Sequence, residues 1–139
     1  MKIKNFAMLG FAGMLLAACG GSNKIVEPSD MNGQKVFFAF DSAEISEEAR
    51  NNLLGQSLYL KNHNDVKVQI AGNCDERGTT EYNLALGQKR ANSAKSVIVK
   101  DGVEANRVST ISYGKEKPAV LGTGESVWSQ NRNATTTVK

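Results

Sequence analysis

Charged residues follow an apolar run in an order that suggests ligand binding between Gly72 and Ala94. An alternating apolar segment leads into the acid-rich turn 74–78 (CDERG), and a helix-forming segment that carries Arg90 comes next. A carboxylate on the turn and a guanidinium on the helix can face the same spot, and a guanidinium matches a carboxylate bidentately. With Asp75 pairing an ammonium and Arg90 a carboxylate, such a site would hold a small zwitterion, such as the amino-acid end of a peptide.

The spacing of the helix supports a groove beside this turn. Asn83, Leu86 and Arg90 are three and four residues apart, so they share one stripe of a helix that begins directly after the turn. Free backbone amides near Thr79, at the start of this helix, would favour the same anionic group as Arg90. This arrangement places Asp75 on one wall of the groove and Arg90 on the other.

A structural role for the same charges is the alternative. Asp75 could form a salt bridge with Arg77 or Arg90 that only ties the turn to the helix, and Arg77 could brace Asp75 in either case. The spacing by itself favours the salt bridge, because an aspartate and an arginine fifteen residues apart are a weak signal of a ligand site.

Catalytic chemistry has little support in the sequence. Asp75 and Glu76 are adjacent, so in an extended chain their side chains diverge, whereas a glycosidase pair faces across about 5–9.5 Å. The one histidine, His63, lies in a polar Asn-His-Asn segment, which offers no base for a nucleophile and no zinc cluster. Cys74 is expected to be a small buried residue rather than a reactive thiol. We therefore expect neither an enzyme nor a metal or cofactor site.

The N-terminus has the features of a lipoprotein signal. Two lysines precede an uncharged apolar stretch, 6–18, which is too short to span a bilayer and is typical of a secretory signal. It ends in Leu-Ala-Ala-Cys19, which resembles the lipobox of bacterial lipoproteins, where the cysteine becomes the acylated N-terminus. Several acyl chains give stable anchoring. By resemblance to the sorting pattern of such lipoproteins, Gly20 rather than aspartate after the cysteine implies the outer membrane. A plain secretory signal is the alternative.

Processing at Cys19 changes the composition only slightly. Removing residues 1–18 leaves 121 residues, enough for one domain, and lowers the formal charge from +3 to +1. The pI of 8.9 is therefore no argument for nucleic acid, and the remainder has no basic run, so we expect no nucleic-acid partner. With Cys19 acylated, Cys74 has no partner for a disulfide.

Hydrophobic periodicity predicts an α+β fold for residues 34–139, after a flexible tether at 19–33. The order β-α-β-α-β-(short α)-β favours helices packed on one face of a mixed sheet. Ser46 is expected to cap the first helix. In the second helix, Leu84, Gly87, Ala91, Ala94 and Ile98 form the expected apolar stripe. The expected elements are strands at 35–40, 66–70, 107–113 and 134–138, and helices at about 46–62, 80–100 and 125–130.

Four strings of sequence resemble the OmpA-like peptidoglycan-binding domain over about residues 34–133. They are 38–42 (FAFDS), 72–79 (GNCDERGT), 81–91 (EYNLALGQKRA) and 112–122 (SYGKEKPAVLG). The resemblance implies the fold of the OmpA C-terminal domain and binding of the peptide stem of peptidoglycan at diaminopimelate. It also implies the pair that binds this zwitterion, Asp75 and Arg90, and further pocket residues, which are Asp41, Arg77, Thr79, Asn83 and Leu86.

The family also supplies an expected cellular setting. Its members engage Tol-system proteins, chiefly the periplasmic TolB, so we expect a non-catalytic, lipid-anchored protein that faces the periplasm and tethers the outer membrane to the wall. The alternative is a protein-interaction lipoprotein whose wall pocket is vestigial. The sequence departs from the family pattern at Ala39 and at Asn133, where the family usually has a second arginine. The last strand also contains three threonines, which supply less apolar area than the family's more apolar residues.

Overall fold

The computed structural model describes residues 24–139, so the expected signal sequence, Cys19 and the first part of the tether lie outside it. Residues 24–139 form a mixed sheet and three α-helices. In chain order the elements are β1 (Gln34–Phe37), α2 (Glu47–Asn62), β2 (Val68–Asn73), α3 (Thr80–Lys100), the 3₁₀ helix η2 (Ala105–Arg107), β3 (Val108–Gly114), α4 (Glu125–Asn131) and β4 (Asn133–Val138).

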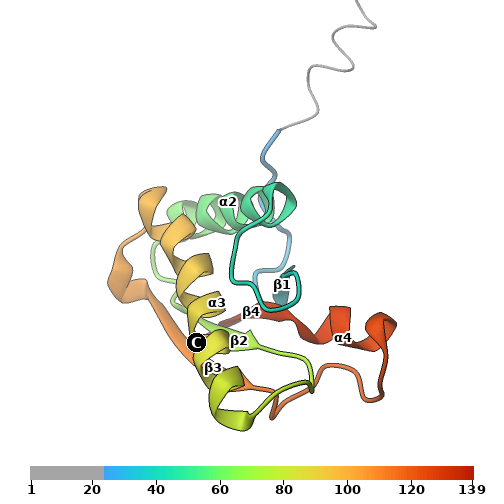
Figure 1. Ribbon diagram of the computed structural model, residues 1–139. Helices are drawn as coiled ribbons and strands as arrows, with labels where there is room; N and C mark the ends of the chain where they lie inside the picture. Colours follow the sequence, from blue (N-terminus) through green and yellow to red (C-terminus); the bar gives the residue numbers. More distant parts are fainter. Residues whose placement is uncertain (1–23) are drawn as a thin grey trace, which may run out of the picture.

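The sheet has the strand order β1-β4-β2-β3. Strand β4 pairs antiparallel with β1 and β2, and β2 pairs parallel with β3, so Ile70 lies beside both Thr136 and Thr110. Helix α3 runs across β2 and β3, with α2 beside it, while α4 lies at the end of the sheet that leads into β4 (Figure 1). This confirms the α+β architecture that the sequence predicted.

Capping side chains set the starts of the two long helices. The Ser46 hydroxyl accepts a hydrogen bond from the Ala49 amide at 3.1 Å, as predicted for an N-cap. Thr79 caps α3 in the same way, through the Tyr82 amide at 3.0 Å. Helix α3 spans the residues that the periodicity predicted, because the Thr79 cap, the apolar stripe and the terminating Asp101-Gly102 all indicate the same bounds.

Two strands differ from their predicted bounds by more than one residue. Strand β1 ends at Phe37 rather than at 40, and β2 runs from Val68 to Asn73 rather than from 66 to 70. After β1 the chain leaves the sheet and turns at Asp41, whose φ of 55° is in the left-handed region. Strand β2 is longer because β3 and β4 pair with it on both sides up to Asn73.

The buried face of α3 contains most of the predicted apolar stripe, since Gly87, Ala91, Ala94 and Ile98 are buried. Gly87 packs closely on the sheet, because a Cβ on Gly72 of β2 would overlap its carbonyl oxygen. Leu84 is 40% exposed, so the expectation that it begins the stripe was wrong. The polar side chains of Asn83 and Arg90 are buried on this side of the helix instead, at 2% and 1% exposed.

The threonine-rich strand β4 packs through hydrogen bonds as well as apolar contacts. Thr136 is 1% exposed, and its hydroxyl donates to the Gln56 side-chain oxygen of α2 at 2.7 Å. The Thr135 hydroxyl donates to Asn133, which is itself buried. Strand β4 thus keeps its place in the sheet although its sequence supplies little apolar area.

Part of the segment expected to be a tether packs on the domain. Met31 is 1% exposed within the hydrophobic core, and the Gly33 amide donates to Thr136 at 2.7 Å. A Cβ on Gly55 of α2 would overlap the carbonyl oxygen of Val26, so this segment also lies against α2. The packed structure therefore begins before residue 34, where we expected the tether to end.

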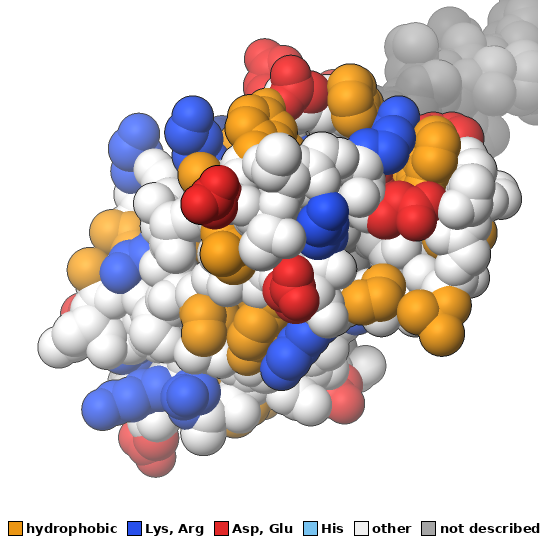
Figure 2. Space-filling view, turned by 60° about the horizontal axis from the view of Figure 1, so that its bottom comes forward, with side chains coloured by type: hydrophobic (Ala, Val, Ile, Leu, Met, Phe, Trp, Pro, Cys, Tyr) orange, Lys and Arg blue, Asp and Glu red, His pale blue; other side chains and the backbone are white. Residues whose placement is uncertain are grey.

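The surface mixes charges of both signs. On the face shown in Figure 2, lysine and arginine side chains alternate with acidic and apolar ones, and no single sign covers this face. Within residues 24–139, no helix is both long enough and apolar enough to cross a membrane.

Candidate functional site

A hollow of about 280 Å³ lies where the loop after β1, the turn after β2 and the first half of α3 meet. Its lining combines two carboxylates and two guanidiniums with aromatic and apolar groups. It consists of Phe40, Asp41, Cys74, Asp75, Arg77, Gly78, Tyr82, Asn83, Leu86 and Arg90. All the predicted pocket residues except Thr79 are in this set. Thr79 instead caps α3 beside the hollow.

Arg90 forms the floor of the hollow and is 1% exposed. Its guanidinium donates to three backbone carbonyls, those of Ser42 at 2.8 Å, Asn73 at 2.9 Å and Ala39 at 3.1 Å. Burial lowers the pKa of Arg90, but a guanidinium keeps its charge in proteins. The sequence predicted that Arg90 would bind a ligand carboxylate or form a salt bridge with Asp75, but not that three of its five N–H groups would donate to backbone carbonyls.

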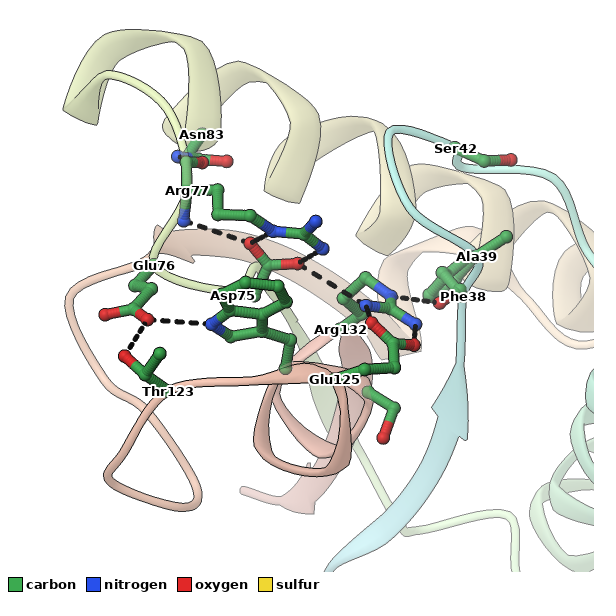
Figure 3. A network of polar contacts seen from close by, with 12 residues as sticks. Phe38, Ala39, Ser42, Asp75, Glu76, Arg77, Asn83, Thr123, Glu125 and Arg132 are labelled. Carbon is green, nitrogen blue, oxygen red and sulfur yellow. Dashed lines mark hydrogen bonds and ion pairs between the residues drawn. The ribbon is translucent and has the colours of Figure 1, made fainter.

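Asp75 is 4% exposed and is held by the arginine two residues on. Its Oδ1 accepts from the Arg77 amide at 3.0 Å and from Arg77 Nε at 3.1 Å, and its Oδ2 accepts from Arg77 Nη2 at 2.8 Å. Arg132 Nη1 lies 3.5 Å from the same Oδ2, so the carboxylate sits between two guanidiniums (Figure 3).

This environment fixes the charge of Asp75. Burial by itself raises the pKa of Asp75, but the hydrogen bonds from Arg77 outweigh it and bring the pKa below its ordinary value. The predicted salt bridge between Asp75 and Arg77 is therefore confirmed. No ion pair joins Asp75 to Arg90 within the part of the chain that the structure describes.

Residues far along the chain complete the surroundings of Asp75. Arg132 follows α4, and its guanidinium bonds the Phe38 carbonyl at 2.8 Å and the Glu125 carboxylate at 2.8 Å. Trp128 of α4 lies against Arg77, with 3.9 Å from the guanidinium carbon to the ring centre. These residues could not be predicted from the sequence, because they are more than forty positions from the turn and no local spacing connects them to it.

Polar contacts also define the mouth of the hollow. The Tyr82 hydroxyl donates to Asp41 Oδ1, which joins the start of α3 to the loop after β1. Phe40 and Tyr82 are 58% and 51% exposed, so an aromatic rim surrounds the charged interior. Asn83 donates to the carbonyl of Arg77 at 2.8 Å and so fixes the turn from inside.

Cys74 lies in the apolar wall. It is 3% exposed, its thiol donates to the Asn83 carbonyl at 3.3 Å, and burial raises its pKa. Its prediction as a buried strand-end residue is confirmed. Among residues 24–139, no group of three or more histidine, cysteine or acidic side chains is placed to hold a metal ion.

Comparisons with known proteins agree on one family. The family model described as the OmpA family matches residues 37–132. The peptidoglycan-associated lipoprotein of Pasteurella multocida is 40% identical over 144 residues, which cover 96% of each chain. The crystal structure of the peptidoglycan-associated lipoprotein from Burkholderia pseudomallei matches with a TM-score of 0.74 and 42% identity, over 76% of this chain and 90% of that one.

A more distant structure shares only the fold. The C-terminal domain of Helicobacter pylori MotB has a TM-score of 0.71 at 18% identity, over 76% of this chain and 84% of that one. The backbone arrangement is thus kept in chains whose sequences have largely diverged.

Proposed function

This chain belongs to the OmpA family, and from that membership we propose that it is an envelope lipoprotein that binds the peptide stem of peptidoglycan non-covalently at its charged hollow. The observation that carries the proposal is that two buried side chains of opposite charge, Asp75 and Arg90, line one hollow without pairing with each other. Relatives that bear the name peptidoglycan-associated lipoprotein support the choice of ligand.

The charges of the hollow suit a zwitterionic group such as diaminopimelate. Arg90 has two N–H groups beyond the three bonded to backbone carbonyls, and in this proposal a ligand carboxylate accepts from them. The carboxylates of Asp75 and Asp41 supply acceptors for the ligand ammonium. The guanidinium and carboxylates are already desolvated or held in place, so little ordering remains to be done when a ligand binds.

Attachment at two ends would make this binding a tether. Acyl chains on Cys19 would hold the outer membrane, and the hollow would hold the wall from the periplasmic side. Confining the domain near the wall raises its effective concentration there, so modest affinity for the stem peptide is sufficient. We include Tol-system proteins, chiefly TolB, among the proposed partners.

Sedimentation with purified sacculi tests wall binding in the absence of other proteins. The detergent-solubilised protein is expected to sediment with the sacculi, and Asp75→Asn is expected to reduce the bound fraction at least tenfold, since it removes a charge while keeping the shape. The matched control is Asp101→Asn, which removes another ion-paired aspartate, 3.1 Å from Lys61 at the far end of α3. A wild-type protein that stays in the supernatant would overturn the proposal and favour the protein-interaction alternative.

Membrane fractionation tests the anchor separately. Cys19→Ala is expected to leave the protein soluble or unprocessed and to abolish incorporation of labelled palmitate. Cys74→Ala removes the other cysteine of the chain and should change neither result. Unchanged fractionation of Cys19→Ala would remove the lipid anchor from the proposal without affecting the wall-binding part.

A further inference from the structure

The guanidinium of Arg77 is held on both of its faces. The Phe40 ring lies 4.0 Å from the guanidinium carbon and the Trp128 ring 3.9 Å from it, so the cation lies between two aromatic rings. The edge of the same guanidinium bonds Asp75 through two nitrogens. Cation–π contacts of this kind restrict a side chain that would otherwise be free to move.

The position of Trp128 is itself fixed by a carboxylate. Its indole Nε1 donates to Glu76 Oε2 at 2.7 Å, and the Thr123 hydroxyl donates to the same oxygen at 2.5 Å (Figure 3). Glu76 belongs to the turn, whereas Thr123 and Trp128 belong to the segment that leads into and forms α4. The turn and α4 are therefore joined both through Glu76 and through Arg77.

The contacts of Arg77 decide which part of Asp75 remains for a ligand. A carboxylate offers about four lone-pair positions. Arg77 occupies three of them, two on Oδ1 and one on Oδ2. The last position, on Oδ2, has only the longer 3.5 Å approach of Arg132. Fixing Arg77 thus fixes the direction in which Asp75 can accept a further hydrogen bond.

We infer that Trp128, and Glu76 through it, are positioning residues for ligand binding, which hold Arg77 and so orient Asp75 in the hollow. Trp128 is not among the described residues that line the hollow, so it acts through Arg77 rather than by touching the ligand. The inference rests on the proposed function, because it assigns these residues a part in binding the stem peptide.

A ligand-free measurement tests the positioning itself. Trp128→Leu removes one ring from Arg77, and the NMR-titrated pKa of Asp75 is expected to rise, because a less firmly held guanidinium stabilises the carboxylate less. Tyr113→Leu is the matched control, since it removes the ring 4.0 Å from Lys117, away from the hollow. An Asp75 pKa that is the same in Trp128→Leu and wild type would overturn the inference.

Binding to a synthetic stem tripeptide that contains diaminopimelate tests the consequence. Calorimetry is expected to show affinity weakened roughly fivefold to tenfold by Trp128→Leu, the order of a cation–π contact. Trp128→Phe keeps a ring over Arg77 and should lose no more than about threefold. Thermal unfolding of each variant establishes that it is folded.

A double-mutant cycle distinguishes an effect of Trp128 on affinity that acts through Arg77 from a general loss of packing. In an Arg77→Ala background, Trp128→Leu should cause no further loss of affinity. An equal loss in both backgrounds would overturn the inference while leaving the proposed function intact. If the wild-type protein does not bind the tripeptide or sacculi at all, the proposed function fails first and this inference fails with it.

The single tryptophan gives an independent readout. Because Trp128 lies against Arg77 and bonds Glu76, its fluorescence is expected to change on titration with the tripeptide. The dissociation constant obtained from this change should equal the one measured by calorimetry. Glu76→Gln, which weakens the hold on the indole, should reduce the affinity less than Trp128→Leu does. Emission that stays constant while calorimetry shows binding would count against a link between Trp128 and the ligand.

Discussion

The Nη1 of Arg90 lies 2.9 Å from the backbone carbonyl oxygen of Asn73, so the middle of α3 is fastened to the end of β2 beneath the hollow. The same guanidinium bonds the carbonyls of Ala39 and Ser42 in the loop after β1. One side chain therefore connects three segments of the domain and also lines the proposed binding site. Its contributions to binding and to stability are coupled.

Replacing Arg90 is expected to destabilise the fold. Arg90→Ala leaves three carbonyls without a charged donor, which should lower the free energy of unfolding by about 3 kcal/mol or more. Urea unfolding followed by circular dichroism measures this loss. Arg50→Ala, at an exposed position of α2, should stay within about 0.5 kcal/mol of wild type. Wild-type stability of Arg90→Ala would show that the carbonyl contacts contribute little.

Asp75 is expected to contribute to the acid sensitivity of the domain. Its pKa is lower in the folded domain than the ordinary value, so the unfolded chain binds more protons as the pH falls. The stability it provides is complete above about pH 4 and is lost as the pH falls through the depressed folded-state pKa. Between pH 7 and pH 2, the free energy of unfolding should therefore fall less for Asp75→Asn than for wild type.

The control for this substitution is Asp65→Asn, which removes an exposed aspartate of the α2–β2 loop, far along the chain from the turn. Exposed Glu76 and Glu125 also have lowered pKa values, owing first to hydrogen bonds from Thr123 and Arg132 respectively. Some acid sensitivity should therefore persist in Asp75→Asn. Identical curves for Asp75→Asn and wild type would contradict the prediction.

The contact between β2 and α3 should tolerate no side chain at Gly72. A Cβ there would overlap the carbonyl oxygen of Gly87 and lie 2.5 Å from its carbonyl carbon, and neither backbone atom can move alone. Gly72→Ala is expected to cost about 3 kcal/mol or more in thermal or urea unfolding. Ala85→Gly, on the exposed side of α3, should cost only about 1 kcal/mol, and an equal loss in both variants would argue against the overlap.

The buried hydrogen bond between Thr136 and Gln56 offers a test of how β4 is held. Thr136→Val leaves the Gln56 side-chain oxygen without a donor in the core, which should cost about 1–3 kcal/mol. Replacing both partners, with Gln56→Leu and Thr136→Val together, should recover part of this loss, because the Gln56 oxygen is then no longer left unpaired, although the part-buried Asn52 oxygen loses the Gln56 amide that donates to it at 2.8 Å. A double variant as unstable as the sum of the single ones would contradict this account.

Local signals in the sequence predicted most of the helices and the order in which helices and strands follow one another along the chain. The bounds of α3 agree with prediction because Thr79, the apolar stripe and the terminating glycine act within a few residues of one another. Strand β1 was predicted too long, because the aromatic and β-branched residues of 35–40 do not reveal that Arg90 and Arg132 bond carbonyls between Phe38 and Ser42. Leu84 was misplaced because the backbone carbonyls that hold the polar side chains of Asn83 and Arg90 on the buried side of α3 belong to other segments.

The residues of the candidate site likewise comprise some that the sequence predicts and others that it does not. Asp75, Asn83, Leu86 and Arg90 could be named from one continuous stretch, because a turn followed by a helix brings them to one groove. The residues that hold Asp75 from outside this stretch, Trp128 and Arg132, could not, because they lie near the turn only through the pairing of β3 and β4 with β2.

The sequence by itself determined the charged turn, the helix that follows it and the family, since these depend on residue types at short separations. Only the tertiary structure decided that Arg90 is buried against carbonyls and that Asp75 is shared between Arg77 and Arg132. The physical reason is that a guanidinium takes whichever acceptors the packed backbone brings within about 3 Å, and that geometry is set by contacts between distant segments.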